Sequence, residues 1–197
     1  IIVGGRLGYV LIYNLGYYSN NFLDIFKIWE GGMSFHGGLI GIIIVSIWFA
    51  RKNGDDPFSF LDIVSMVAPI GIFFGRIANF INSELYGTET NLPWAVNFAQ
   101  VDNLYRHPSQ IYEAIFEGIV LFIILNLFYK KFSEKTGVVS ALFLICYSAF
   151  RFVIEFTREP DAHIGLLMFS MSLGQIISII FFMAGTILFY KNYVSKK

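Results

Sequence analysis

The sequence predicts an all-α integral membrane protein, and three observations carry this prediction. Of the 197 residues, 56% are hydrophobic and only 14% are charged, whereas an ordinary soluble domain has roughly 25% charged residues. Several apolar segments approach or reach the length of about 17–25 residues that a transmembrane helix requires. Basic residues gather in the connections on one side of these segments. Because so few charges could not cover a water-exposed surface, we expect lipid to surround most of the chain.

Six apolar segments are the predicted transmembrane helices. They cover about residues 1–18, 35–50, 61–81, 111–129, 138–157 and 171–190. No hinge, repeat or low-complexity tract divides the chain, so we expect a single transmembrane domain over residues 1–197. A short outer-face segment is expected between the third and fourth helices.

Glycine and proline predict details of how these helices pack. Pairs of small residues four positions apart let helix backbones approach each other closely. Three such pairs consist of two glycines, namely Gly4/Gly8, Gly37/Gly41 and Gly71/Gly75. Pro69 lies inside the third predicted helix and predicts a kink there.

The basic residues predict the orientation of the chain. The connections after the second and fourth helices and the C-terminus together carry eight Lys or Arg residues, and the opposite side carries three. Cytoplasmic connections are the ones enriched in Lys and Arg. We therefore expect the C-terminus, and also Ile1, to be cytoplasmic.

Polar residues of four predicted helices fall in one outer layer of the membrane. His36 opens the second helix, and Arg76 leads a polar stripe near the outer end of the third. The other members of this layer are Asn79, Asn82, Glu84, Glu113, Glu117, Tyr147, Arg151, Glu155 and Arg158. A charge at the bilayer centre costs about 2.5–3.5 kcal/mol on insertion scales, so such residues face a cavity or a partner. A set of this size at one depth favours a wet functional cavity, although the arginines and carboxylates could also simply pair with one another.

The chemistry that suits this layer is recognition of an anion. Arginine suits bidentate hydrogen bonding to phosphate, and lipid headgroups are the phosphates available at that depth. His36 stands between glycines that let backbone or substrate come close, so it is either a general base or a structural histidine. The zero formal net charge argues against a nucleic-acid partner. Cys146 is expected to be a buried small hydrophobe, and the His and carboxylate spacing matches no HExxH-type metal motif.

The stretch from Gly75 to Gly87 reads GRIANFINSELYG, and it resembles the signature of the prolipoprotein diacylglyceryl transferase family. Three further blocks resemble that family in the same order, at residues 31–41, 107–113 and 147–161. The resemblance implies transfer of a diacylglyceryl group from phosphatidylglycerol to the lipobox cysteine thiol of a prolipoprotein. The implied products are a thioether and glycerol phosphate, which would make this the first step of bacterial lipoprotein maturation. No cofactor or metal is implied, and the implied location is the bacterial cytoplasmic (inner) membrane, with the active site toward the outer leaflet.

The resemblance also implies roles for individual residues. The implied catalytic residues are His36, Arg76 and Arg151. Those implied to bind substrate are Arg76, Asn79, Gly87, Tyr147 and Arg151. Those expected to support the site are Asn82, Glu84, Glu113, Glu155 and Arg158. Whether His36 or an arginine-assisted route activates the thiol stays open.

Two expectations qualify this interpretation. The family has seven spans with an outside N-terminus, whereas this chain has six predicted spans and no initiator methionine, so we expect the first helix of the family to be missing here. The alternative functions are an anion transporter and a lipid-binding membrane scaffold. A transporter would need polar residues on both sides of the membrane, and the predicted layer is confined to the outer half.

Overall fold

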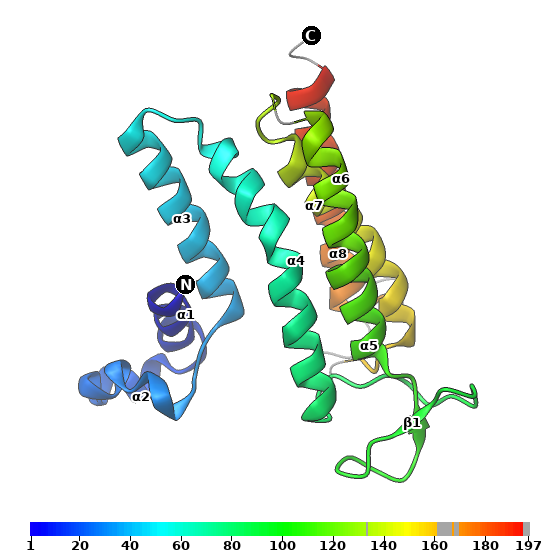
Figure 1. The fold of residues 1–197 in the computed structure, drawn as a ribbon. Helices are drawn as coiled ribbons and strands as arrows, with labels where there is room; N and C mark the ends of the chain where they lie inside the picture. Colours follow the sequence, from blue (N-terminus) through cyan, green and yellow to red (C-terminus); the bar gives the residue numbers. More distant parts are fainter. Residues whose placement is uncertain (133, 161–166, 168–169, 195–197) are drawn as a thin grey trace. The chain divides into compact units, whose positions relative to one another are not determined.

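The computed structural model describes residues 1–132, 134–160, 167 and 170–194, except for the side chains of residues 35, 36 and 194. The chain divides into two compact units, Ile1–Leu61 and Asp62–Lys197, and each is described here by itself. Both units are built almost entirely of helices (Figure 1). The prediction of an all-α architecture is confirmed, and that of one domain over residues 1–197 stays a prediction.

The first unit begins with a short, interrupted series of helices and ends with a long one. Its elements are α1 (Ile2–Gly8), the π-helix η1 (Tyr9–Tyr13), α2 (Leu15–Asn20), the 3-10 helices η2 (Phe22–Phe26) and η3 (Ile28–Glu30), and α3 (Phe35–Asn53). The predicted single helix over residues 1–18 is interrupted at Asn14, where φ is −147° and ψ is 35°. Hydropathy gave no sign of this break, because it records polarity and not backbone angles.

Glycines hold α1 against α3. A Cβ atom on Gly4 would lie 2.5 Å from the carbonyl oxygen of Gly37, and one on Gly8 would lie 2.8 Å from the Cα of the same residue. Only glycine permits such backbone approach, so the predicted role of Gly4, Gly8 and Gly37 in packing is confirmed. By contrast, a Cβ on Gly71 or Gly75 would meet no described atom within 4 Å.

The second unit contains the remaining long helices. α4 (Pro57–Ile81) begins just before the unit boundary and continues through Pro69. One continuous helical stretch follows, made of α5 (Ser109–Glu113), the π-helix η4 (Ala114–Val120) and α6 (Leu121–Phe132). The last elements are α7 (Val138–Ile154), the 3-10 helix η5 (Glu155–Thr157), α8 (Leu173–Phe189) and the π-helix η7 (Tyr190–Val194). Between α4 and α5 lie the antiparallel strands β1 (Val96–Asn97) and β2 (Tyr105–Arg106).

The core of this unit lies where α6 and α7 meet. Leu121, Leu125 and Val139 are buried together there, and Tyr147 and Cys146 pack against them. Asp62 of α4 is also buried, and its carboxylate accepts hydrogen bonds from the backbone N–H groups of Gly137 and Ser140, each at 2.7 Å. Asp62 thus satisfies free N–H groups at the start of α7, which explains a charge that the predicted outer layer left out.

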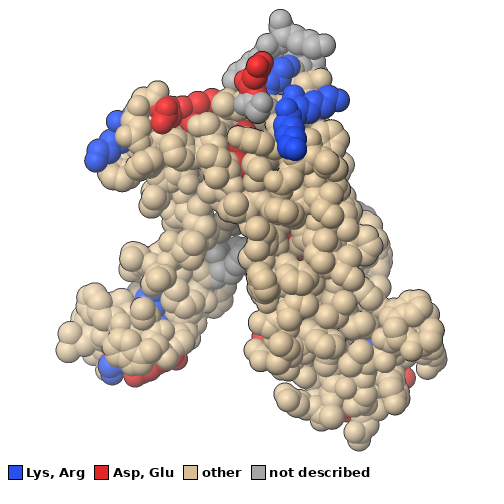
Figure 2. Space-filling view, in the orientation of Figure 1, with Lys and Arg blue, Asp and Glu red and all other residues tan. Residues whose placement is uncertain are grey.

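In the described part of the chain, four helices are long and apolar enough to cross a membrane: Pro57–Ile81, Ser109–Phe132, Val138–Thr157 and Leu173–Tyr193. They coincide with the last four predicted spans. Large apolar side chains point outward from them, among them Phe74, Leu127 and Ile187, which are 65–69% exposed. On the face shown in Figure 2, described charged residues gather near helix ends and the flanks are almost uniformly tan. A multi-pass membrane protein is confirmed, and the count of six spans stays a prediction.

Candidate active site

Six ionisable side chains meet inside the second unit. They come from α4, from the α5–η4 stretch, and from α7 with the residues after it: Arg76, Glu113, Glu117, Arg151, Glu155 and Arg158. We call this set the Arg–Glu cluster. The side chains of Glu113 and Glu117 are fully buried, whereas those of Arg76 and Arg151 keep 16% and 12% of their surface exposed. The two carboxylates are therefore fully enclosed, and the two arginine side chains are partly accessible.

Glu113, the last residue of α5, is the centre of the cluster. One of its oxygens pairs with Nη1 of Arg151 and lies 3.3 Å from Nη1 of Arg158. Its other oxygen lies 3.3 Å from Nε of Arg76. A carboxylate buried in an apolar bundle is stable only when it is paired, and Glu113 is paired with three guanidinium groups.

Glu117 shares two of those arginines. Its Oε2 lies 3.3 Å from Nη2 of Arg76, and its Oε1 lies 3.8 Å from Nη1 of Arg151. It belongs to the π-helix η4, a helix type that is rare and that is frequently found at functional sites. The sequence placed Glu117 at this depth without giving it a role, and its four-residue spacing from Glu113 was the only signal.

Glu155 is held from two sides. It pairs with Nη2 of Arg151, and its Oε1 accepts a hydrogen bond of 2.9 Å from the Ser172 hydroxyl. Ser172 caps α8, and a Cβ on the following Gly174 would lie 2.5 Å from the same Glu155 oxygen. Sequence reasoning missed Ser172 and Gly174. The pattern Ser172-x-x-Gln175 signals a capped helix start, but nothing in it points to Glu155.

A close approach between two helices lets Arg76 reach both glutamates. A Cβ on Gly118 of η4 would lie 2.8 Å from the Cβ of Phe73, one turn before Arg76 on α4. Because Gly118 has no side chain, α4 can pack closely against η4 beside the cluster. Sequence reasoning did not single out Gly118, because its partner lies 45 residues earlier in the chain.

The predicted face of the fifth span is present with one difference. Arg151 on α7, Glu155 on η5 and Arg158 just after η5 all reach the cluster, as their spacing predicts. Tyr147 instead packs on the core residues, with its ring stacked on Phe143 at 5.7 Å between centroids. Its predicted contact with substrate stays a prediction.

Only the first part of the GRIANFINSELYG segment is helical. α4 ends at Ile81, so Arg76 and Asn79 are helical, while Asn82 and Glu84 follow the helix with exposed side chains. Among the described residues the Glu84 carboxylate makes no ion pair. Glu84 contributes its carbonyl oxygen instead, which accepts a hydrogen bond of 2.6 Å from the side chain of Gln110.

Backbone contacts of Gly87 connect this segment to the residues that follow α7. Its N–H donates to the carbonyl of His107 at 3.0 Å, and it forms a β-bridge with Arg158. A Cβ there would lie 2.5 Å from the carbonyl oxygens of both His107 and Thr157. Only glycine fits between these two strands of backbone, which is a structural reason for the residue beside its predicted binding role.

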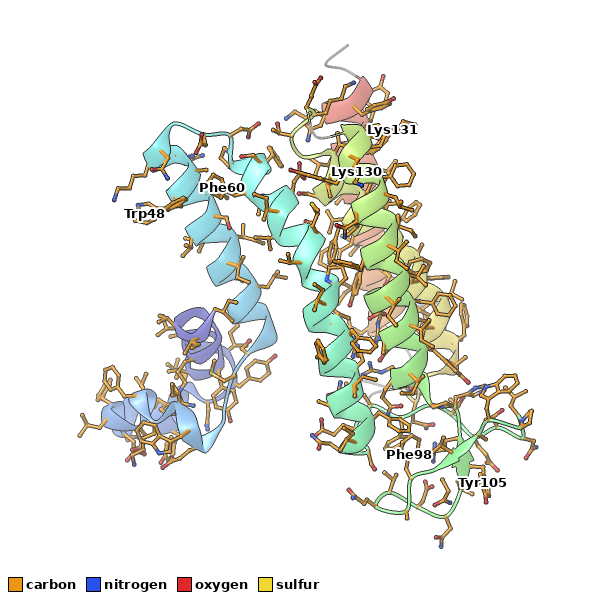
Figure 3. All side chains as sticks on the ribbon, in the orientation of Figure 1. Trp48, Phe60, Phe98, Tyr105, Lys130 and Lys131 are labelled. Carbon is orange, nitrogen blue, oxygen red and sulfur yellow. The ribbon has the colours of Figure 1, made fainter. Side chains whose placement is uncertain are left out.

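Arg106 organises the segment outside the spans. Its guanidinium lies 2.8 Å from Asp102 and 3.0 Å from Glu159, and it covers the ring of Tyr86. It also donates to the carbonyl of Gly87 at 3.1 Å. The hydrogen bonds from Arg106 hold the pKa of the Asp102 carboxyl below its usual value. In Figure 3, Tyr105 and Phe98 lie in this segment, at the end of the bundle opposite Lys130 and Lys131.

The predicted histidine belongs to the first unit. His36 is the second residue of α3, directly after a turn in which the Ser34 hydroxyl accepts a hydrogen bond from the N–H of Gly37 at 3.2 Å. The His36 side chain lies outside the described part of the structure, so its role stays a prediction. His107 contacts the Tyr112 hydroxyl at 3.3 Å. Among the described residues, no three His, Cys, Asp or Glu side chains are arranged to hold a metal ion.

The cluster can present positive charge to an anion at one edge. Its three arginines and three glutamates balance in charge, so the alternative in which they pair with one another describes what is seen. Pairing and anion binding are nevertheless compatible. Each guanidinium has five N–H donors, and the side chains of Arg76 and Arg151 keep 16% and 12% of their surface exposed, which leaves room for contact with an anion.

Comparison with known proteins gives one consistent result. The sequence profile of the family described as prolipoprotein diacylglyceryl transferase matches residues 1–191. Three similar proteins are named phosphatidylglycerol–prolipoprotein diacylglyceryl transferase. The protein of Aeromonas salmonicida is 48% identical over 193 residues, which are 98% of this chain and 70% of that protein. The protein of Vibrio atlanticus is 51% identical over 179 residues, 91% and 65% of the two chains. The protein of Bordetella avium is 52% identical over 190 residues, 96% and 72% of the two chains. The chain thus spans between 65% and 72% of the length of these relatives.

Proposed function

Because the chain belongs to the prolipoprotein diacylglyceryl transferase family, we propose that it transfers a diacylglyceryl group from phosphatidylglycerol to the lipobox cysteine of a prolipoprotein. The relatives are named for these two substrates. The observation that supports the proposal best is the joining of Arg76 and Arg151, from different helices, by one buried glutamate. A pair of fixed guanidinium groups inside an apolar bundle suits the phosphate of a membrane lipid.

The donor lipid is the substrate that the arginines bind. Arg76 and Arg151 hold its phosphate, and Asn79, Gly87 and Tyr147 position the headgroup or the peptide. Negative charge grows on the phosphate as glycerol phosphate leaves. Donors that are already in place at that point lower the barrier, because no reorganisation is needed during the reaction.

The acceptor thiol must lose its proton to react. A free thiol has a pKa of about 8.5, so an activating base or a nearby cation is required near neutral pH. We propose His36 as the base. The sulfur then attacks the glyceryl carbon that carries the phosphate ester. A C–S bond forms, the C–O bond to the phosphate breaks, and glycerol phosphate leaves with the electron pair of that bond.

The remaining predicted residues support the two arginines. Glu113 and Glu155 hold them through ion pairs, and Arg158 pairs with Glu113. Asn82 and Glu84 belong to the turn that follows α4. We place the protein in the bacterial inner membrane with this site toward the outer leaflet and the C-terminus in the cytoplasm.

A transfer assay tests the proposal. The purified protein in detergent is given phosphatidylglycerol with a labelled diacylglyceryl group and a lipobox peptide, and the labelled peptide is measured. We expect transfer, and its loss in Arg76→Gln and His36→Ala. Lys130→Gln, at the opposite end of the bundle, is the matched control that keeps activity. Binding of phosphatidylglycerol without any transfer would reject the enzyme and favour a lipid-binding scaffold.

A further inference from the structure

We propose that the Glu117 carboxylate is an exchangeable counter-ion, which neutralises Arg76 and Arg151 in the empty site and yields its place to the phosphate of the donor lipid. This inference rests on the proposed function, because it assumes that the donor is an anionic lipid. It assigns Glu117 a positioning role that its place in the sequence does not reveal.

Glu117 is the least firmly held carboxylate of the cluster. Among the described residues its ion-pair partners are Arg76 and Arg151, the two residues proposed to bind phosphate. Its side chain is fully buried, and its Oε1 lies 3.8 Å from Nη1 of Arg151, beyond hydrogen-bond distance. Its described ionic contacts are this long pair and a hydrogen bond of 3.3 Å from Arg76, so its release breaks fewer and longer contacts than release of Glu113 would.

The other two glutamates are anchored elsewhere as well. Glu113 also pairs with Arg158. Glu155 accepts a hydrogen bond from Ser172 and fills the space left by Gly174 on α8. Phosphate binding would leave these anchors in place. Judged by the contacts of the described residues, Glu117 alone of the three glutamates can leave both phosphate-binding arginines without breaking a further contact of its own.

The charges favour a one-for-one exchange. The six residues of the cluster sum to zero, and the phosphodiester of phosphatidylglycerol carries one negative charge. Adding that charge to a balanced, buried cluster would leave one anion without a counter-ion, which is costly in a low-dielectric interior. Release of Glu117 from the arginines restores the balance if the freed carboxylate then takes up one proton from solvent.

The groups that face Glu117 are consistent with this exchange. Arg76 approaches from α4 and Arg151 from α7. Glu113 lies one turn away on α5, and Tyr147 of α7 is close enough to interact with its charge. With both arginines turned to a phosphate, the described neighbours left to Glu117 are the Glu113 carboxylate, which repels its charge, and the Tyr147 phenol, which does not replace the two positive charges. A neutral, protonated Glu117 is the form that suits this state.

Lipid binding to Glu117→Gln tests the inference, because glutamine has the shape of protonated glutamic acid without its charge. Titration calorimetry with phosphatidylglycerol in detergent micelles, repeated in buffers of different ionisation enthalpy, gives both affinity and proton uptake. We expect about tenfold tighter binding than in the wild type. The wild type should take up close to one proton per bound lipid, and Glu117→Gln should take up none. Diacylglycerol, which lacks the phosphate, should show neither difference.

Kinetics distinguish this role from a merely structural one. Glu117→Gln should lower KM for phosphatidylglycerol and also lower kcat, because glycerol phosphate is retained longer. A structural defect would raise KM and lower kcat together. Asp62→Asn removes another buried carboxylate that is not in the cluster, and it should leave lipid affinity unchanged. If Glu117→Gln does not accumulate, lipid binding is measured with Glu117→Asp instead. The shorter aspartate side chain holds the arginines less well, so this variant should also bind lipid more tightly than the wild type.

The outcomes separate the two proposals. Weaker or unchanged lipid binding by Glu117→Gln, or no proton uptake by the wild type, would overturn the counter-ion role even where the wild type transfers lipid. The expected binding and proton uptake without transfer to the lipobox peptide would support the counter-ion role and reject the proposed reaction.

Discussion

The two units of the protein bury arginine in opposite ways. In the first unit, the guanidinium of Arg6 donates to backbone carbonyls, for example to Ile25 at 2.8 Å and Gly32 at 3.0 Å, and lies 5.3 Å from the centre of the Tyr18 ring. The other acceptors are the carbonyls of Asp24, Lys27 and Gly31. In the second unit, Arg76 and Arg151 pair with the side chains of glutamates.

The difference indicates what each arginine is for. Backbone carbonyls cannot leave without unfolding the chain, so Arg6 fastens α1 to the loop before α3. Carboxylates on flexible side chains can move or take up a proton, so Arg76 and Arg151 can exchange partners. Buried charge thus stabilises the fold in one unit and, in our proposal, binds substrate in the other. The following substitutions test this contrast.

The largest expected effect is on catalysis by Arg151→Lys. Lysine keeps the positive charge but loses the planar fork that pairs with Glu113 and Glu155 and that binds phosphate in two-pronged fashion. We expect the rate of diacylglyceryl transfer to fall about 100-fold while the protein still inserts and accumulates. Near-normal turnover would show that Arg151 acts only as a point charge.

Arg6→Lys should act on stability instead. An ammonium has three donors and cannot serve all five carbonyls that now accept from Arg6. We expect the free energy of unfolding to fall by about 2–3 kcal/mol, measured by thermal or denaturant unfolding in detergent. Unchanged stability would mean that water replaces the lost donors and that Arg6 is not a fastening residue.

Gly118→Ala should weaken the cluster without touching any charge. The new Cβ would lie 2.8 Å from the Cβ of Phe73, so α4 must move and carry Arg76 away from Glu117. Overpacking of this kind costs about 1–3 kcal/mol, and we expect transfer activity to fall about tenfold, in line with that energy. The double variant Gly118→Ala with Phe73→Gly removes the Cβ that the new methyl group would meet, so it should regain part of the activity. Failure of that rescue would reject the steric explanation.

The smallest expected effect concerns the segment outside the spans. Arg106 lowers the pKa of Asp102, so this pair contributes stability above the unfolded pKa of about 3.9. That contribution is lost as the pH falls through the lowered folded value. Hydrogen exchange of the β1–β2 segment should therefore accelerate slightly at acidic pH, and Asp102→Asn should abolish the change. Equal pH dependence in both proteins would assign it to other carboxylates.

Much of this arrangement followed from sequence spacing and depth. The spacing of Arg151, Glu155 and Arg158 fits one face of a helix, which predicted that they lie together. The hydropathy pattern placed Arg76 and Glu113 at the same depth in the membrane, which predicted that they could meet. The sharing of Arg76 and Arg151 by Glu117 was not predictable in detail, since nothing local marks η4 as a π-helix. Nor was the break at Asn14, for hydropathy does not encode backbone angles.

Contacts to backbone and contacts between distant segments were the least visible. The described hydrogen-bond acceptors of Arg6 are backbone carbonyls and not side chains, so the identity of the residues cannot reveal them. Ser172 and Gly174 reach Glu155 only after the chain has turned back from α7 to α8. For Glu84, the spacing of the polar stripe suggested a position on the same helix as Arg76, whereas α4 ends before Glu84.

The most direct test of the contrast is phosphatidylglycerol binding by two matched variants, Arg76→Lys and Arg6→Lys, measured by titration calorimetry in detergent below their unfolding temperatures. Each removes one guanidinium held by acceptors inside its unit and keeps one positive charge. We expect Arg76→Lys to bind the lipid at least about tenfold more weakly than the wild type, and Arg6→Lys to bind it with wild-type affinity. Wild-type affinity in Arg76→Lys, or an equal loss in both variants, would contradict this expectation.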